Sequence, residues 1–248
     1  MQVIPLSEGT FTIGHDKIFI PFDETRDVLT DRPTGSLLVE IQPFLVITSK
    51  DYILCDLGLG YFLQNGALQI HQNLRNVGVE PEQITKVLMS HLHKDHAGGV
   101  SYIDALTGDR KMMFPDATYY VRKAEFEFAM NDPKKSYLPE ELALLATAPN
   151  VQWLTEPNGI IDGYIQYYHS GGHSPFHQVF LIEEGHDKVF FGGDEAPQKK
   201  QMIVKYVAKY DYDGKRAMEL RAQYAEEGRA EGWEFLFYHD VKMPSSKL

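Results

Sequence analysis

Six consecutive residues, HLHKDH at positions 91–96, hold four side chains that can bind a metal ion: His91, His93, Asp95 and His96. The chain has only ten histidines in 248 residues. A chance cluster is therefore rare, and a solvated loop that merely contains histidines is the weaker interpretation. Imidazole and carboxylate groups suit Zn²⁺ and similar divalent ions. The stretch predicts a metal site.

Three residues farther along the chain have a similar setting. His173 lies in SGGHSPFHQ, where glycines and a proline predict a tight loop between two strands. Asp194 ends the predicted strand KVFFGGD, and His239 ends the predicted strand WEFLFYH. Each of these alone could be a turn former or an ordinary polar residue at a strand end. If the strand ends converge, five histidines and two aspartates surround one cavity.

The elements that must position these residues alternate between strands and helices. Apolar and alternating patterns predict strands within 11–21, 36–50, 51–60, 84–90, 164–170, 177–184, 188–194 and 233–240. Helical spacing predicts helices at 66–79 and 212–232, a strand followed by a helix over 114–130, and a short helix in VSYIDAL after Gly98-Gly99. Residues 131–149 combine a loop and a helix with the composition of a surface insertion. Without a linker or repeat, we expect one domain over 1–248, a sandwich of two sheets with helices outside.

Composition narrows the class of protein. The net charge of −11, with scattered cations, disfavours nucleic acid as a partner. No run of eighteen apolar residues is present, so we expect no membrane span. The start lacks the features of a secretory signal, which predicts a cytoplasmic location. The lone Cys55 excludes an internal disulfide framework and a cysteine-built zinc site. Oligomeric state is not readable from these features.

The three residues Ser246, Lys247 and Leu248 spell a peroxisomal address. That alternative location applies only if the source is a eukaryote.

Five motifs together resemble the metallo-β-lactamase superfamily over nearly the whole chain: DLGLG at 56–60, HLHKDH at 91–96, GGHSP at 171–175, GGD at 192–194 and YHD at 238–240. The resemblance implies an αββα sandwich of two mixed β-sheets with helices on both outer faces, and two metal ions. By resemblance, the first ion would be bound by His91, His93 and His173, the second by Asp95, His96 and His239, with Asp194 bridging both. Asp56 and His177 would orient the site without binding metal.

This ligand set implies hydrolysis. Two divalent ions, with Zn expected and Mn, Co or Fe accepting similar ligands, could share a water whose pKa falls towards neutrality. The metal-bridging hydroxide would attack a carbonyl carbon or phosphorus of a small-molecule substrate, and Asp95 would also carry a proton to the leaving group. Asp194 stands where some β-lactamases place a cysteine ligand, which makes antibiotic hydrolysis a weaker expectation. His93 stands where the oxygen-reducing di-iron relatives have glutamate, which disfavours that redox chemistry.

The segments 114–129 and 212–240 resemble the N-acyl homoserine lactonases and methyl parathion hydrolase, which implies a lactone, ester or organophosphate substrate. Phe176 replaces the second glycine of that group's usual G-H-[ST]-P-G-H loop. Its ring would either line the substrate pocket or plug the fold without touching substrate.

Two other functions stay open. Persulfide dioxygenases share H-x-H-x-D-H but use a single iron, and metal stoichiometry separates them from a dinuclear hydrolase. A non-catalytic binding module that kept the fold should have lost some ligands, whereas all seven are present here.

Overall fold

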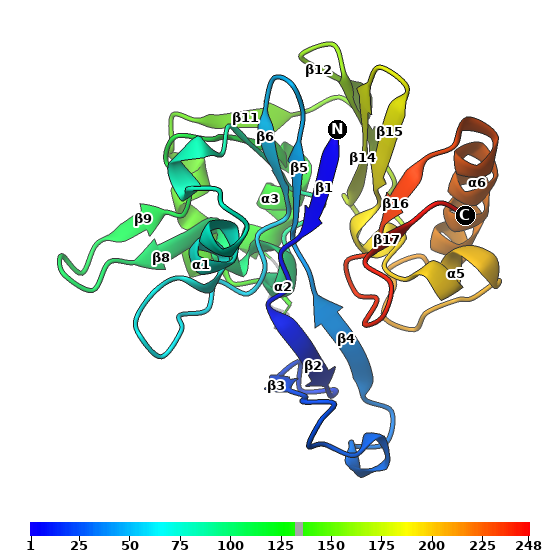
Figure 1. Cartoon of the computed structure of the whole chain (residues 1–248), viewed down its shortest axis with the longest axis horizontal. Helices are drawn as coiled ribbons and strands as arrows, with labels where there is room; N and C mark the ends of the chain where they lie inside the picture. Colours follow the sequence, from blue (N-terminus) through cyan, green and yellow to red (C-terminus); the bar gives the residue numbers. More distant parts are fainter. Residues whose placement is uncertain (132–135) are drawn as a thin grey trace.

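The computed structural model describes residues 1–131 and 136–248, and its main feature is a pair of facing β-sheets with helices on their outer sides (Figure 1). The first sheet has the order β1-β5-β6-β7-β10-β11 and the second the order β12-β13-β14-β15-β16-β17. Both contain parallel and antiparallel pairs. The strands of the first sheet are Gln2–Pro5, Phe44–Ile47, Tyr52–Cys55, Lys86–Leu88, Thr118–Arg122 and Val151–Leu154. Those of the second are Asn158–Ile161, Ile165–His169, Gln178–Glu184, Asp187–Phe191, Glu234–Leu236 and Ser245–Ser246.

Alternation along the strands divides the apolar side chains between three core layers. On β5, Phe44 and Val46 face the second sheet, whereas Leu45 faces the helices. The helices α1 (Gln69–Asn76), α3 (Lys123–Asn131) and α4 (Pro139–Leu142) pack on the outer face of the first sheet. The helices α5 (Lys199–Ile203) and α6 (Gly214–Glu231) cover the second. The expected αββα sandwich is confirmed.

Two smaller sheets extend from this sandwich. β2 (Gly9–Ile13), β3 (Phe19–Pro21) and β4 (Leu37–Ile41) form a three-stranded lobe that projects away from the two main sheets (Figure 1). β8 (Ser101–Ile103) and β9 (Arg110–Met112) form a hairpin. The remaining helical turns are α2 (Lys94–Ala97) and the 3₁₀ segments Leu29–Asp31, Pro81–Gln83, Gly98–Val100, Ala143–Ala146 and Gly193–Glu195.

The helix expected in VSYIDAL is wrong. Residues 98–100 form a 3₁₀ turn and residues 101–103 form strand β8, which pairs with β9. Pairing with strand β9, which follows closely in the chain, outweighs the weak helical pattern of so short a segment. The local sequence does not predict this pairing.

Other expected elements are present with different boundaries. The strand expected over 11–21 is a hairpin that turns at Lys17, whose φ of 61° is left-handed, and the strand over 36–50 is divided into β4 and β5. Residues 132–135 of the expected surface insertion lie outside the described part of the chain. Beyond them, Leu142 and Leu145 are buried in the core, so one side of this segment packs against the rest of the fold while the other side is exposed.

The end of the chain is part of the fold. Ser246 lies in β17, and Leu248 packs against the core between the second sheet and α6. Among the helices that the structure describes, none has the length and apolar character needed to cross a membrane.

Candidate metal centre

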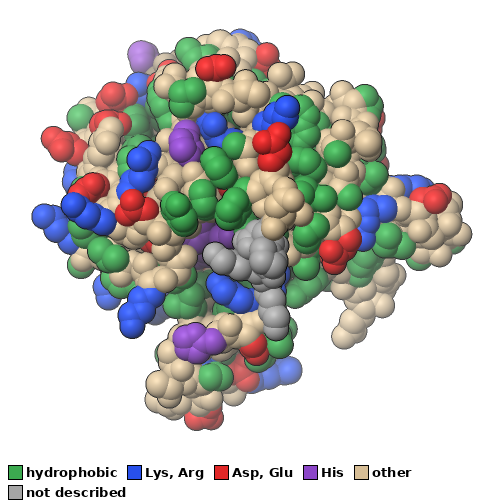
Figure 2. Space-filling model, turned by 180° about the vertical axis from the view of Figure 1, so that it is seen from behind, with side chains coloured by type: hydrophobic (Ala, Val, Ile, Leu, Met, Phe, Trp, Pro, Cys, Tyr) green, Lys and Arg blue, Asp and Glu red, His purple; other side chains and the backbone are tan. Residues whose placement is uncertain are grey.

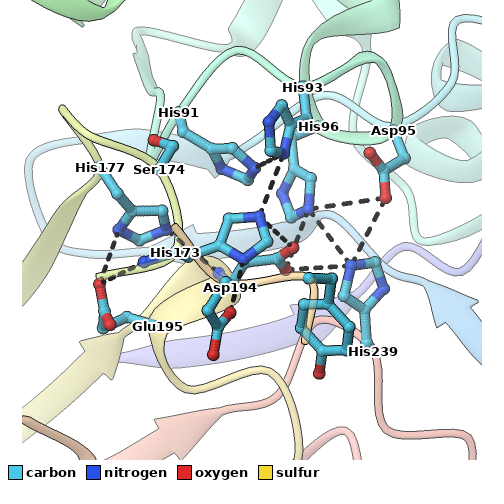
Figure 3. Close-up of polar contacts among 12 residues, drawn as sticks. His91, His93, Asp95, His96, His173, Ser174, His177, Asp194, Glu195 and His239 are labelled. Carbon is cyan, nitrogen blue, oxygen red and sulfur yellow. Dashed lines mark hydrogen bonds and ion pairs between the residues drawn. The ribbon is translucent and has the colours of Figure 1, made fainter. Parts of the chain in front are cut away.

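The seven predicted ligands meet at the ends of strands from both sheets (Figure 3). The motif 91–96 begins just after β7, with His93 at the N-terminus of α2. The rest come from the second sheet: His173 lies between β13 and β14, Asp194 in the 3₁₀ turn after β15, and His239 after β16. Strands rooted in a packed sheet fix these positions more firmly than a free loop would.

The side chains form two groups that share Asp194. In the first group, Nδ1 of His93 lies 2.9 Å from Nε2 of His91 and 3.1 Å from Nε2 of His173. In the second, Nε2 of His239 lies 3.3 Å from Nε2 of His96 and 3.5 Å from Oδ2 of Asp95.

Asp194 lies between the two groups and faces both. Its Oδ2 is 3.1 Å from Nε2 of His173, and its Oδ1 is 3.2 Å from Nε2 of His96 and 3.0 Å from Nε2 of His239. Each carboxylate oxygen thus lies close to a different group, which is the geometry that a bridging carboxylate requires.

In four histidines, the ring nitrogen that points away from the centre, Nδ1, has a hydrogen-bond partner. Nδ1 of His96 donates to Asp56 at 2.7 Å, that of His173 to Asp211 at 3.0 Å, and that of His239 to the Glu40 carbonyl at 2.7 Å. Nδ1 of His91 lies 3.0 Å from Ser90 Oγ, and this hydroxyl itself donates to Asp56, so it accepts from the imidazole. These bonds leave the Nε2 lone pairs free to face the centre, as ligating histidines require.

This donor set fits divalent metal ions. Asp194 is buried, and its Oδ1 accepts no hydrogen bond of normal geometry despite the two nearby imidazoles. A buried carboxylate oxygen without a hydrogen bond is costly unless a cation satisfies it. The Nε2 atoms of His96 and His239, which face each other 3.3 Å apart while both Nδ1 atoms are hydrogen-bonded, are likewise arranged for an ion between them.

The pKa shifts of the candidate ligands show which of them influence one another through charge. Burial alone would raise the pKa of Asp194, but His239, His96 and His173 hold it well below its usual range. Burial lowers the pKa of His91 and His93 far below normal, and their histidine neighbours add to the effect. Burial would lower the pKa of His96, His173 and His239, but the carboxylate of Asp194 raises it. A metal ion would displace these protons, because neutral imidazoles and an ionised carboxylate are the forms that bind metal.

Asp56 fixes the loop that carries the ligands. It is fully buried, adopts a left-handed φ of 55°, and accepts hydrogen bonds from both the backbone N–H and the hydroxyl of Ser90 at 2.7 and 2.6 Å. Asp56 also accepts from His96, so it holds both Ser90, directly before the motif, and His96, at its end. The orienting role of Asp56 at a metal centre stays a prediction.

Close backbone packing holds the same region. A Cβ on Gly98 would lie 2.5 Å from the Leu59 carbonyl oxygen, and a Cβ on Gly60 would lie 2.2 Å from that of Gly98. The turn after β6 and the turn after α2 therefore touch through their backbones, and only glycine permits this approach.

His177 contacts the backbone of Asp194. Its Nε2 accepts the backbone N–H of Asp194 at 3.2 Å, and its Nδ1 lies 2.8 Å from Ser170 Oγ. His177 therefore contacts the backbone of Asp194, and both of its ring nitrogens have partners other than the side chains of the two groups.

A buried network on α6 supports His173. Arg221 is 1% exposed; it donates to the Glu195 and Tyr206 carbonyls at 3.3 and 2.6 Å and lies 3.7 Å from Asp211 Oδ2. Asp211 in turn accepts from His173. The guanidinium thus connects α6, the end of β15 and, through Asp211, the candidate ligand His173.

Glu125 on α3 supports the opposite side. One of its oxygens accepts from the Leu92 backbone at 3.2 Å and the Tyr137 hydroxyl at 3.0 Å, and the other accepts from Ser174 at 3.1 Å. The carboxylate therefore connects the two loops that carry His93 and His173.

The centre opens into a cavity of about 1000 Å³. Figure 2 shows a hollow on this face between the projecting lobe and the body of the molecule, with histidine side chains at its base. The lobe contributes Phe19, Leu38 and Val39, and the body contributes Phe128 and Tyr206. Such a mixture of apolar walls and a polar base is typical of a small-molecule site.

Phe176 does not line this cavity among the residues that the structure describes, although its neighbours Ser174 and Pro175 do. Its ring packs 5.9 Å from Phe128 and stacks 6.4 Å from His169. Of the two roles considered for Phe176, this position favours packing within the fold, where Phe176 contacts Phe128 and Phe128 lines the cavity.

Several residues of the site were not predicted from the sequence. Asp211 and Arg221 lie in a loop and on a helix without any motif, and Glu125 and Tyr137 belong to α3 and the segment after it. Glu195 was also not predicted, although its position directly after Asp194 in GGDE could have indicated that it lies near the site.

Comparison with known proteins agrees with this geometry. The profile described as Metallo-beta-lactamase superfamily matches residues 39–230. An N-acyl homoserine lactonase of Bacillus sp. is 28% identical over 170 residues, which is 68% of this chain and 61% of the relative. The lactonase AttM of Agrobacterium fabrum is 28% identical over 151 residues, 56% of this chain and 47% of the relative. The chain thus matches about half to three fifths of these relatives' length.

Solved structures share the fold. A probable metal-dependent hydrolase from Staphylococcus aureus has a TM-score of 0.76 at 21% identity, with 98% of this chain and 91% of that chain covered. The dizinc quorum-quenching lactonase AidC, in complex with a product, has a TM-score of 0.71 at 20% identity, with 99% and 89% covered. Because the family profile spans well over half of the sequence and six of the seven ligands, this chain belongs to the metallo-beta-lactamase superfamily.

Proposed function

We propose that this chain is a dinuclear metal-dependent hydrolase that opens a lactone or ester. The observation that carries the proposal is the position of Asp194, whose two oxygens lie 3.0–3.2 Å from histidines of both ligand groups. His91, His93 and His173 would hold one ion, and Asp95, His96 and His239 the other. A single-ion site would leave the second group of buried side chains without a cation.

When bound, two such ions supply Lewis acidity and a water of lowered pKa as the nucleophile. The chain's own residues would position the ligand atoms and the substrate. Asp194 and the four Nδ1 bonds keep the donor atoms in place without rearrangement during the reaction. The apolar walls of the cavity exclude water and orient the substrate against the centre.

Asp95 is the residue placed to move a proton. Its side chain is 14% exposed, more than that of Asp194 or Asp56, and it lines the cavity. The Tyr238 hydroxyl donates to its backbone carbonyl at 2.7 Å, and the Tyr238 ring stacks on His96 at 4.0 Å. A carboxylate held beside the leaving group can deliver a proton to it.

The proposed substrate class rests on the relatives. The curated relatives from Bacillus and Agrobacterium are named N-acyl homoserine lactonases, and one solved structure of similar fold holds the product N-hexanoyl-L-homoserine at its catalytic metal centre. An organophosphate substrate is a weaker proposal, since the same centre would act on phosphorus as well as carbon. The zinc assignment follows the ligand types, with Mn, Co and Fe as alternatives. A cytoplasmic location stays a prediction.

Turnover before and after metal removal tests this function. Protein loaded with Zn²⁺ should hydrolyse N-hexanoyl homoserine lactone or 4-nitrophenyl butyrate, lose that activity on chelation and regain it on reloading. Activity that survives complete metal removal would overturn the proposal. Oxygen uptake with one iron per chain would favour the persulfide dioxygenase alternative instead.

A further inference from the structure

The cavity above the metal centre has an unusual balance of charge. Among the described residues that line it, four are lysines, namely Lys17, Lys94, Lys200 and Lys209, and none is glutamate. The acids that line it are Asp95 and Asp194 of the metal centre, and Asp211, which already contacts His173 and Arg221. Once the centre holds its ions, the cavity presents a net positive surface.

This balance is opposite to that of the whole chain, which has 35 acidic and 24 basic residues. Most of a protein with a net charge of −11 repels small anions. Salt screens that repulsion beyond about 10 Å, so the charges that line the cavity act most strongly on a ligand inside it. Cations gathered at one cavity therefore select for an anion there.

One of these lysines is fixed in place. Lys94, between His93 and Asp95, donates from Nζ to the Lys17 carbonyl at 2.5 Å and lies 5.4 Å above the ring of Phe19. These contacts join the metal-binding loop to the β2–β3 turn of the lobe. Lys17 is thereby held at one wall of the cavity.

The other two come from a different part of the chain. Lys200 is on α5, and Lys209 is in the segment between α5 and α6. Within the described ranges, no carboxylate comes within ion-pair distance of Lys17, Lys200 or Lys209. Some lysines elsewhere do have such partners: Lys86 lies 2.6 Å from Asp51 and Lys188 lies 2.6 Å from Glu231. Figure 2 shows a cationic side chain beside the histidines in the hollow.

We propose that the substrate carries an anionic group, a carboxylate or a phosphate, apart from the bond that is cleaved, and that Lys17, Lys200 and Lys209 bind it. The proposal rests on the hydrolase function above and adds the charge of the substrate. The apolar walls at Phe19 and Phe128 would contact the spacer between the anion and the scissile group.

Binding of matched amides tests the proposal without depending on turnover. The zinc-loaded protein is titrated calorimetrically with N-methylglutaramate, with the phosphonate of equal length, N-methyl-4-phosphonobutanamide, and with the neutral N,N′-dimethylglutaramide. The carboxylate and phosphonate arms distinguish the two kinds of anion. The variant carries Lys17→Glu, Lys200→Glu and Lys209→Glu. Lys205→Glu is the control, since it lies in the same segment but does not line the cavity.

One or both anions should bind the wild type about tenfold or more tightly than the neutral amide, with a preference that weakens as salt is added. The triple variant should lose that preference, and Lys205→Glu should keep it. Equal affinity for all three amides, or an anion preference that survives in the triple variant, would overturn the proposal.

Turnover of 4-nitrophenyl butyrate against mono-4-nitrophenyl glutarate separates this proposal from the broader one. If the neutral ester is hydrolysed and the anionic ester is not preferred, the hydrolase function is supported and the proposal of an anionic substrate is overturned. If neither ester is hydrolysed while the anion preference in binding persists, the hydrolase function fails instead.

Discussion

Oδ1 of Asp211 lies 3.0 Å from Nδ1 of His173, although the two residues are 38 positions apart in the chain. The contact joins the segment before α6 to a ligand of the first metal group, and Arg221 lies behind it. A carboxylate in this position holds the ring orientation and raises the basicity of the nitrogen that faces the metal. Through Arg221 and Asp211, the helix α6 is thus connected to His173 of the candidate metal centre.

Replacing Asp211 with alanine should weaken metal binding about 10- to 100-fold, because His173 loses the acceptor that orients it. Competition with a chelating dye measures the change. Asp211→Asn should recover part of the affinity, since its amide oxygen can still accept. Asp213→Ala is the control: it removes the side chain that accepts from the Arg216 N–H at the start of α6, so it should lower stability without changing metal affinity. Equal loss of affinity in both alanine variants would contradict the account.

Asp95→Asn should lower kcat by about 10²- to 10⁴-fold at saturating metal, since the amide cannot carry a proton to the leaving group. Metal content is measured beside kcat, so that loss of a ligand is separated from loss of the proton carrier. Tyr238→Phe removes only the hydroxyl that donates to the Asp95 backbone and should cost much less. A fully loaded Asp95→Asn enzyme with normal kcat would remove the proposed role of this residue.

Gly98→Ala should destabilise the fold by about 1–3 kcal/mol, because the new methyl group would lie 2.5 Å from the Leu59 carbonyl oxygen. Denaturant unfolding measures the loss. Gly14→Ala, in an exposed turn of the lobe where the nearest atom is a flexible Asp16 oxygen at 3.1 Å, should stay within about 0.5 kcal/mol of the wild type. Similar midpoints for the wild type and Gly98→Ala would show that the two turns separate easily.

Stability should depend on pH through Glu8, which is buried and accepts from the Leu59 N–H at 2.7 Å. Burial raises the pKa of its carboxyl from 4.5 to about 8. The folded state therefore binds the proton more tightly than the unfolded state, and stability falls as pH rises from 4.5 towards 8. Above pH 8 this contribution stays constant.

Glu8→Gln removes this dependence, because its amide does not titrate. The difference in unfolding free energy between the two proteins should change by up to about 1.4 kcal/mol per pH unit in that window, with the variant gaining as pH rises. Urea unfolding at pH 5, 7 and 9 measures it. Parallel stability profiles for both proteins would show that Glu8 is not buried as described.

The sequence was most informative where chemistry and secondary structure coincide. His91, His173, Asp194 and His239 each follow a strand, and strands of neighbouring sheets end at a common edge, so their convergence could be expected from strand position alone. The sandwich followed from alternating apolar residues, as in β5, where Phe44 and Leu45 face different layers.

What could not be predicted depends on contacts between distant segments. The β8–β9 pairing and the contact of Asp211 with His173 are decided by how the loops pack. The position of Phe176 behind Phe128 depends on α3, which the motif around His173 does not describe. The lysines of the cavity come from the lobe, the metal-binding loop and the α5–α6 segment, which carry no common motif.

Metal stoichiometry tests the central claim most directly. Elemental analysis of protein purified without chelator and saturated with Zn²⁺ should give two ions per chain, and His239→Ala should give one, because only the group of Asp95, His96 and His239 is broken. A single ion in the wild type, with the same content in His239→Ala, would contradict a dinuclear centre bridged by Asp194.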